Sequence, residues 1–358
     1  MLTVLSVAYP FAPVSRDAVG GAEQVLATLD EALVRAGHRS LVVAREDSMP
    51  RGRLIPVPAP GGVVTDEVSH AVHRATRAAI EDALRRWPVD VIHMHGIDFH
   101  ACLPPAGPPL LATLHLPPSW YPPEAFRIRR PETYLHCVSV PQHGACPPDA
   151  PLLPPVTNGV DVDRLPAPVS RRGFALALGR VCPEKGFEHA LDACHIAGVP
   201  LIVGGEVYPF EAHRRYFREQ VWPRLDARRR FAGPVGFRRK RRLLSAARCL
   251  LVPSVADETS SLVAMEALAC GTPVIAYKRG ALPHIVDHGR TGFLVEDAAG
   301  MADAIRAAHH IDAEDCRRAA RERFSSAMMT ELYLETYRLL ADEERLAAAR
   351  GRKVEHAA

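Results

Sequence analysis

Short apolar runs and helically spaced apolar residues alternate along the first half of the chain. Residues 2–8 and 40–44 are apolar runs with the length of buried strands, and between them Val25, Leu26, Leu29 and Leu33 recur at helical spacing. This strand–helix–strand order predicts a parallel sheet with crossover helices. The same reasoning predicts a helix over 70–87 and strands over 89–93 and 110–114.

Prolines interrupt the pattern in the middle of the chain. Seventeen of the 32 prolines fall between Pro104 and Pro168. Each proline fixes a backbone angle and removes a hydrogen-bond donor, so this stretch is predicted to hold loops and short strands. The turn sequence at Asn158–Asp161 and the prolines Pro166 and Pro168 place a domain junction there.

The alternation restarts after the junction. It predicts two doubly wound, Rossmann-like α/β domains over 1–165 and 170–325, while 326–358 form a terminal helix that returns to the first domain. Two such domains facing each other leave a cleft at the carboxyl ends of their strands, where ligands of open parallel sheets bind. In the second half, strands are predicted over 174–178, 201–203, 229–232, 249–252 and 274–276, and helices over 187–197, 211–224, 240–247, 261–269 and about 328–347.

Composition narrows the class of protein. With 47% hydrophobic and 24% charged residues, the chain can bury a large core and is not disordered. It has no run of about 18 apolar residues, so no membrane-spanning helix is expected. The first ten residues lack the basic region and cleavage site of a secretion signal. The eight cysteines form no C-x-x-C motif, so we expect reduced thiols in a cytoplasmic protein.

Charge is distributed unevenly. The stretch Arg214–Arg248 holds thirteen Lys or Arg residues against two acids, a balance of +11 in a chain of net charge +3. This stretch is predicted to be a solvated helical face or a surface that contacts an anionic membrane peripherally, at its inner face. Nucleic acid is not an expected partner, because the stretch belongs to no recognisable nucleic-acid-binding module.

A glycine-flanked loop with two cations follows the strand at 174–178. Arg180 and Lys185 lie within Gly179–Gly186, which precedes a predicted helix. A guanidinium offers a planar fork to phosphate and an ammonium a compact charge, so together they suit a diphosphate. Alone, the two cations are more typical of an exposed loop.

A second motif spans Glu258 to Pro273. Glu258 follows a strand, Ser260 or Ser261 can cap the next helix, and Glu266 lies within that helix. Backbone N–H groups at the start of a helix suit an anion or a hydroxyl-rich ligand. A carboxylate such as Glu266 can accept two hydrogen bonds from a ribose diol, and Glu258 can accept them from sugar hydroxyls.

Together these motifs resemble those of the family 4 glycosyltransferases, retaining enzymes of the GT-B fold. The resemblance rests on two glutamates separated by seven residues and followed by ALACGTPVIA, on HGRTGFLV at 288–295, and on Gly179–Gly186. In the first half, Gly20-Gly21-Ala-Glu, ATLH at 112–115 and NGVD at 158–161 are also similar. The likeness covers nearly the whole chain.

The resemblance implies a role for each matching position. Arg180 and Lys185 would neutralise the nucleotide diphosphate, which the Gly21 amide would approach, and His115 would lie beside the donor sugar and the acceptor. Glu258 would hold the donor sugar, and Glu266 would hold the ribose. The remaining donor-binding residues would line the diphosphate and the sugar: Gly20, Gly179, Thr259, Ser260, Ser261 and Leu262.

The implied reaction is transfer of a sugar, with retention at the anomeric carbon, from a UDP-sugar or a related donor to a hydroxyl acceptor. The family needs no metal or other cofactor, because the cations replace a divalent ion at the leaving group. Two departures from the family pattern concern the sugar pocket. Thr259-Ser260-Ser261 replaces a common Gly-Phe-Gly, and His284 stands where relatives usually have a glutamate.

Three other functions fit part of the sequence. A nucleotide-sugar epimerase of the same fold would bind the same donor, and a non-catalytic protein could bind the nucleotide sugar alone. His93-Met-His95 after a strand could supply two metal ligands in a hydrolase, with His93 as a structural residue as the alternative.

Overall fold

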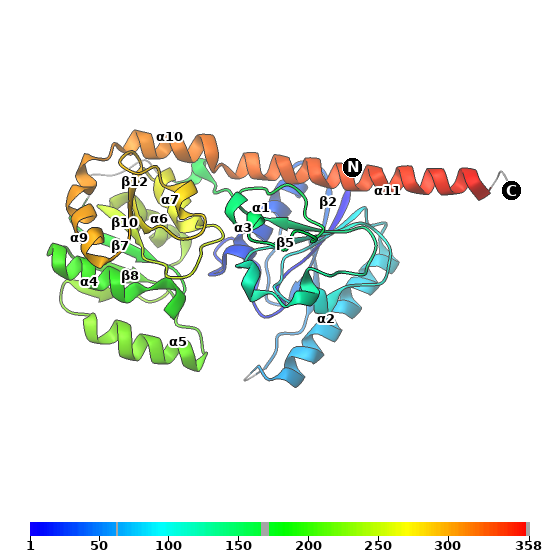
Figure 1. Ribbon diagram of the computed structural model, residues 1–358. Helices are drawn as coiled ribbons and strands as arrows, with labels where there is room; N and C mark the ends of the chain where they lie inside the picture. The colour runs from blue at the N-terminus through cyan, green and yellow to red at the C-terminus, as the bar shows by residue number, and fades with distance from the viewer. Residues whose placement is uncertain (62–63, 166–171, 356–358) are drawn as a thin grey trace. The chain divides into compact units, whose positions relative to one another are not determined.

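The computed structural model describes residues 1–61, 64–165 and 172–355, which form two compact units. Unit 1 comprises Met1–Thr157 with Met329–Ala358, and unit 2 comprises Asn158–Met328 (Figure 1). The units divide between Thr157 and Asn158, at the start of the predicted junction, and the part of that junction at 166–168 lies outside the described residues. None of the described helices is long and apolar enough to cross a membrane.

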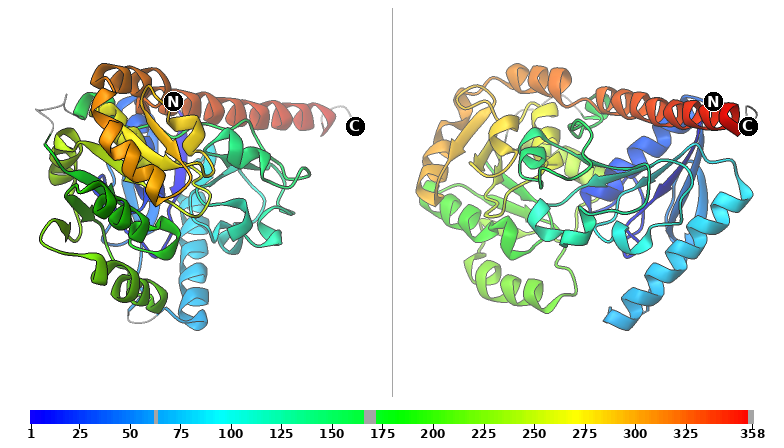
Figure 2. Two further views of the ribbon diagram at one scale, coloured as in Figure 1. Left: turned by 60° about the vertical axis from the view of Figure 1, so that its left-hand side comes forward. Right: turned by 45° about the vertical axis from the view of Figure 1, so that its right-hand side comes forward.

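Unit 1 is built on a parallel sheet of six strands in the order β3-β2-β1-β4-β5-β6. Both faces of the sheet are covered: α1 packs on the face of Val42 and Ala44, and α2 packs on the face of Leu41 and Val43 (Figure 2). The elements are β1 (Thr3–Val7), α1 (Gly21–Arg35), β2 (Arg39–Arg45), β3 (Arg53–Val57), α2 (Asp66–Arg86), β4 (Val91–Met94), β5 (Leu110–Leu114), β6 (Thr133–Cys137), α3 (Val140–Gly144) and, from Met329 onward, α11 (Ser326–Glu355).

Unit 2 repeats this architecture with the order β12-β11-β10-β7-β8-β9. Alternate residues of β7 enter two cores: Ala175 and Ala177 pack with α4 and α9, and Leu176 and Leu178 pack with α7 and α10. The elements are β7 (Ala175–Leu178), α4 (Phe187–Ala197), β8 (Leu201–Gly204), α5 (Glu211–Tyr216), β9 (Arg229–Phe231), α6 (Phe237–Ala246), β10 (Cys249–Val252), α7 (Leu262–Ala269), β11 (Val274–Tyr277), α8 (Leu282–Ile285), β12 (Gly292–Val295), α9 (Ala298–Ala307) and α10 (Ala313–Arg323).

The predicted doubly wound α/β class is confirmed, and the differences are local. The continuous helix predicted over 211–224 is wrong, because α5 ends at Tyr216 and continues as a π-helical turn over Phe217–Val221 and a 3₁₀ turn that contains Pro223. A proline cannot donate the hydrogen bond that would continue an α-helix. The edge strands β3, β6, and β12 were not predicted. The strand β3 contains Pro56, which an edge position tolerates.

Candidate active site

The loops that follow β7, β8 and β10 lie next to one another, since these parallel strands are neighbours and their carboxyl ends share one edge of the unit 2 sheet. Two of these loops are joined by their backbones. The Val255 N–H donates to the Glu184 carbonyl over 3.0 Å. Gly186 has a φ of +59°, and a Cβ there would lie 2.4 Å from the Pro253 carbonyl oxygen. Only glycine allows this approach, which fixes the cation-bearing loop against the loop of Glu258.

Lys185 and Glu258 form an ion pair across these two loops. The Lys185 Nζ lies 2.5 Å from Glu258 Oε1, and the Glu258 side chain is only 10% exposed. Ser254 donates to the same carboxylate oxygen, and the Ala281 N–H donates to the Glu258 carbonyl over 2.6 Å. An ammonium group has three donors, and the bond to Glu258 uses one of them. Lys185 can therefore hold the carboxylate in place and still donate to an anionic ligand.

Arg180 is placed by an aromatic ring from the loop after β8. Its guanidinium lies 5.7 Å from the centroid of the Tyr208 ring, within the range of a cation–π interaction. The backbones of the two loops pass so closely that a Cβ on Gly205 would lie 1.8 Å from the Gly179 carbonyl oxygen. The predicted phosphate-binding loop is thus packed between the loops after β8 and β10, with a cation near each.

Glu266 is buried in α7 and paired with Lys240, a residue that lies outside the predicted motifs. The Lys240 Nζ lies 2.6 Å from Glu266 Oε1, and the two side chains are 16% and 8% exposed. Lys240 comes from α6, inside the arginine-rich stretch that was interpreted as a solvated or membrane-facing surface. The scarcity of lysine is the sequence feature that could have drawn attention to Lys240. The chain has only four lysines, and the structure shows that two of them contact the two glutamates of the motif.

The serine cap predicted at the start of α7 is not formed. Ser261 occupies the position before the helix, but its side chain makes no capping hydrogen bond, since its backbone (φ −114°, ψ 86°) is not that of a usual N-cap. The Met265 N–H bonds to the Ser261 carbonyl instead. The Ser260 hydroxyl is buried and has no hydrogen-bond partner among the described residues. The segment that follows Glu258 therefore holds a buried hydroxyl, that of Ser260, which a ligand could hydrogen-bond.

Gly20 and Gly21 lie at the start of α1 in unit 1. Gly20 is the residue before the helix, and it has no side chain that could cap the first turn. A Cβ on Gly20 would lie 1.8 Å from a carboxylate oxygen of Glu23, which is only 7% exposed. The first turn of α1 therefore has a carboxylate folded back over the space that the glycine leaves, where the positive end of the helix dipole stabilises it.

His115 follows β5 in the same unit and stacks on a second histidine. The His115 and His95 rings lie 5.3 Å apart at 19°, and His95 Nδ1 is 3.0 Å from His115 Nε2. Burial lowers the pKa of His115 to about 4. The imidazole is therefore neutral at pH 7, and it can exchange a hydrogen bond with a ligand but carries no charge.

His93 is held by hydrogen bonds at both of its ring nitrogens. Its Nδ1 lies 2.7 Å from the hydroxyl of Tyr337 in α11, and its Nε2 lies 2.7 Å from the Thr113 hydroxyl. Burial, followed by the nearby His136 and His115, holds the pKa of His93 well below its usual value. With both nitrogens engaged, the His93–His95 pair does not offer the two ligands that a metallohydrolase would need.

Comparisons with known proteins agree with this architecture. The family model "Glycosyl transferases group 1" matches residues 173–310, and "Glycosyltransferase Family 4" matches residues 19–137. The phosphatidyl-myo-inositol mannosyltransferase of Mycobacterium leprae is 29% identical over 335 residues, which is 82% of this chain and 84% of that protein. The D-inositol 3-phosphate glycosyltransferase of Streptomyces avermitilis is 47% identical over 79 residues, 22% of this chain and 17% of that protein.

Solved structures give the same result. AviGT4, a glycosyltransferase involved in avilamycin A biosynthesis, is 26% identical with a TM-score of 0.68, and the alignment covers 95% of this chain and 98% of that one. HepE from Anabaena, solved with UDP and glucose, shares the fold at 18% identity with a TM-score of 0.72, over 94% of this chain and 99% of that one. The chain belongs to the family 4 glycosyltransferases of the GT-B fold. It is a glycosyltransferase.

Proposed function

We propose that this glycosyltransferase moves a hexose from a nucleotide-diphosphate sugar, with UDP as the nucleotide, to a hydroxyl acceptor with retention at the anomeric carbon. The observation that carries the proposal is the pairing of Lys185 with Glu258 in two joined loops, with Arg180 in the same loop as Lys185. Two cations suit the diphosphate and a carboxylate suits sugar hydroxyls. The phosphatidyl-myo-inositol mannosyltransferase and the HepE complex with UDP and glucose support a hexose and UDP.

Each residue has a defined role in this proposal. Arg180 and Lys185 neutralise the diphosphate, so the reaction requires no divalent ion or other cofactor at the leaving group. Glu258 and the Ser260 hydroxyl bind the donor sugar, and Glu266 binds the ribose diol. Gly179 and the Thr259–Leu262 backbone complete the donor contacts of unit 2.

Unit 1 contributes Gly20, Gly21 and His115 in this proposal. The Gly21 amide donates to the diphosphate, which requires the Glu23 carboxylate to turn away from the start of α1, because two anions would otherwise repel each other. His115 is neutral at pH 7, so it donates or accepts a hydrogen bond beside the sugar. Because it carries no positive charge, it does not attract the diphosphate away from the two cations.

The proposed reaction proceeds on one face of the sugar. The acceptor oxygen bonds to the anomeric carbon as the bond to the diphosphate breaks, through an oxocarbenium-like state. The acceptor proton passes to the departing phosphate oxygen, and the products are a glycoside and a nucleoside diphosphate. No side-chain nucleophile is needed, so catalysis depends on positioning and on stabilising the charge of the leaving group.

The proposal predicts release of UDP from a UDP-sugar and an unchanged anomeric configuration in the product. Nucleotide release is followed with a panel of UDP-, GDP- and ADP-sugars, and proton NMR of the glycoside reports the configuration. Inversion would contradict the mechanism, and release from a GDP-sugar alone would contradict the nucleotide. Isomerised donor without net release would identify an epimerase, and binding without either reaction would identify a binding protein.

We also propose that the enzyme is cytoplasmic and that its basic stretch 214–248 contacts the anionic inner face of the membrane. Arg229 and Lys240 are excluded from this surface, because their side chains are only 9% and 16% exposed and pair with Asp226 and Glu266. Trp222, 64% exposed, lies in the same stretch, and such an amphipathic ring suits a membrane interface. The exposed cations of the stretch are Arg214, Arg215, Arg218, Arg228, Arg230, Arg238, Arg239 and Arg242.

The expected result is co-sedimentation with phosphatidylglycerol-containing vesicles at low salt and its loss at high salt, because screening weakens contacts between exposed charges. Replacing Arg238, Arg239 and Arg242 together with alanine should reduce the pelleted fraction several-fold. Phosphatidylcholine vesicles are the control. Equal pelleting with both kinds of vesicle, or none with anionic vesicles at low salt, would contradict the proposed contact.

A further inference from the structure

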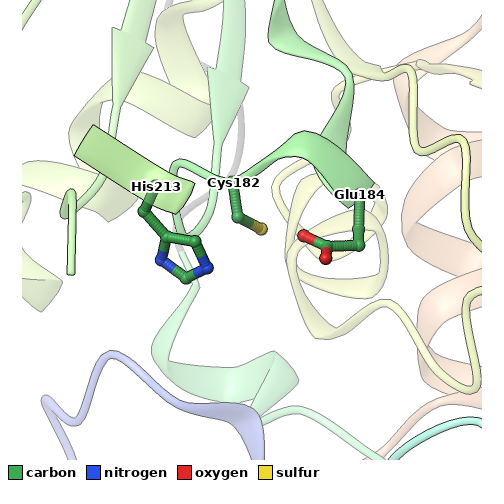
Figure 3. Close-up of side chains that lie close together, drawn as sticks. All are labelled: Cys182, Glu184 and His213. Carbon is green, nitrogen blue, oxygen red and sulfur yellow. The ribbon is translucent and has the colours of Figure 1, made fainter. Parts of the chain in front are cut away.

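Three side chains with metal-ligand atoms meet next to the loop that carries Arg180. Cys182 and Glu184 belong to this loop, and His213 comes from α5. Their ligand atoms all lie within 4.8 Å of one another. Figure 3 shows the Cys182 sulfur between the imidazole of His213 and the carboxylate of Glu184. The three residues come from two segments about thirty residues apart, so the cluster depends on the fold.

Two polar atoms of this cluster lack hydrogen-bond partners among the described residues. Glu184 Oε2 and His213 Nδ1 are both buried and have no hydrogen-bond partner among the described residues. The buried Cys182 thiol makes a long contact, 3.6 Å, to the Arg180 carbonyl oxygen, and it also hydrogen-bonds with the Glu184 carboxylate. Buried polar atoms are nearly always paired, so two unpaired atoms of ligand type in one cluster indicate a missing group.

We propose that Cys182, Glu184 and His213 bind a zinc ion through the thiolate, one carboxylate oxygen and one imidazole nitrogen, with a fourth position open to water. Sulfur and imidazole ligands select zinc over magnesium or calcium, which prefer oxygen. Ligand atoms of a tetrahedral zinc lie about 3.2–3.8 Å apart, so the side chains need to move by about an ångström. On binding, the Cys182 S–H bond breaks, the zinc–sulfur bond forms, and the proton passes to solvent.

The backbone around the cluster is already fixed. The Glu184 carbonyl accepts from Val255, and the Val181 N–H donates to the Glu206 carbonyl over 2.9 Å. The His213 ring packs edge-on against Phe210, with centroids 5.2 Å apart. An ion here would cross-link α5 to the loop that carries Arg180. The proposed zinc ligands are different residues from Arg180 and Lys185, the two cations assigned to the diphosphate. The zinc site therefore does not depend on the proposed function.

Cobalt(II) titration of the full chain tests the site, because cobalt takes the same tetrahedral ligands and is coloured. We expect one cobalt per chain, a thiolate-to-cobalt charge-transfer band in the near ultraviolet, intense visible bands, and displacement of all of them by zinc. Cys182→Ser should abolish the near-ultraviolet band and weaken binding by at least about 100-fold, and His213→Ala should weaken it by at least about tenfold.

Cys146→Ser is the matched control, since Cys146 is a partly exposed thiol in unit 1 and should leave binding unchanged. Because Cys182 is buried, circular dichroism checks that its variant folds, and the half-buried His213 gives a second, independent variant. A lack of saturable cobalt binding, or a charge-transfer band that persists in Cys182→Ser, would overturn the assignment. So would unchanged affinity in a folded His213→Ala variant.

Discussion

Alanine at Arg180 or at Lys185 is expected to lower turnover about 10²–10³-fold, the usual cost of removing one donor that stabilises a developing negative charge. Charge accumulates on the departing diphosphate as the glycosidic bond breaks, so these cations contribute more in the transition state than in the bound donor. The loss should therefore appear mainly in kcat, with a smaller change in the KM for the donor. Steady-state release of nucleotide measures both parameters.

Two controls separate this effect from a general loss of charge. Lys278→Ala removes a lysine that is also ion-paired, with Glu296, but lies outside the proposed site, and Arg290→Ala removes an exposed arginine. Both should keep near-normal kcat. Lys185→Arg retains the charge and should recover part of the activity. Near-normal turnover in the Arg180→Ala/Lys185→Ala double variant would refute the assignment of these two residues.

Alanine at Glu266 is expected to lower both stability and donor affinity. It leaves the ammonium of Lys240 buried without its partner, which costs about 3 kcal/mol. For a unit of this size, the melting temperature should fall by about 6–12 °C. Loss of two hydrogen bonds to the ribose should also raise the KM for the donor at least about tenfold. Calorimetry and steady-state kinetics provide the two readouts.

The chain offers a matched pair for comparison. Glu296→Ala removes the partner of Lys278, and since that pair is 49% and 72% exposed, its loss should change the melting temperature by no more than about 2 °C. Adding Lys240→Met to Glu266→Ala should restore most of the stability without restoring the KM, because a methionine is not penalised for burial. A melting temperature unchanged by Glu266→Ala would show that the ion pair does not stabilise unit 2, and an unchanged KM would exclude Glu266 from the ribose contact.

Local pattern predicted much of the second half correctly. The helix predicted over 187–197 agrees with α4, and the strand over 249–252 agrees with β10. These elements are internal and strongly periodic, so sequence alone indicates where they lie. The prediction was least accurate at edge strands and at 211–224, where a proline and a π-helical turn interrupt the helix.

The candidate site, too, could be predicted only in part from the sequence. Lys185 and Glu258 were both predicted as site residues, but their ion pair, across 73 positions, follows from the adjacency of β7 and β10. Lys240 was hidden in a basic stretch whose net charge suggested a surface, although its burial against Glu266 places it inside unit 2. The Cys182 cluster could not be predicted, because its ligands match no short metal-binding spacing.

The amino-acid sequence alone was enough to locate most of the internal strands and helices, the glycines that permit close loop contacts, and the motif of two glutamates with its two cations. All of these are local, since they depend on the conformations of neighbouring residues and on periodicity. Which charges pair, which histidines stay neutral and which thiol lies beside an imidazole depended on the three-dimensional fold. Strand order sets those contacts between distant residues, and burial sets their protonation by removing water from around them.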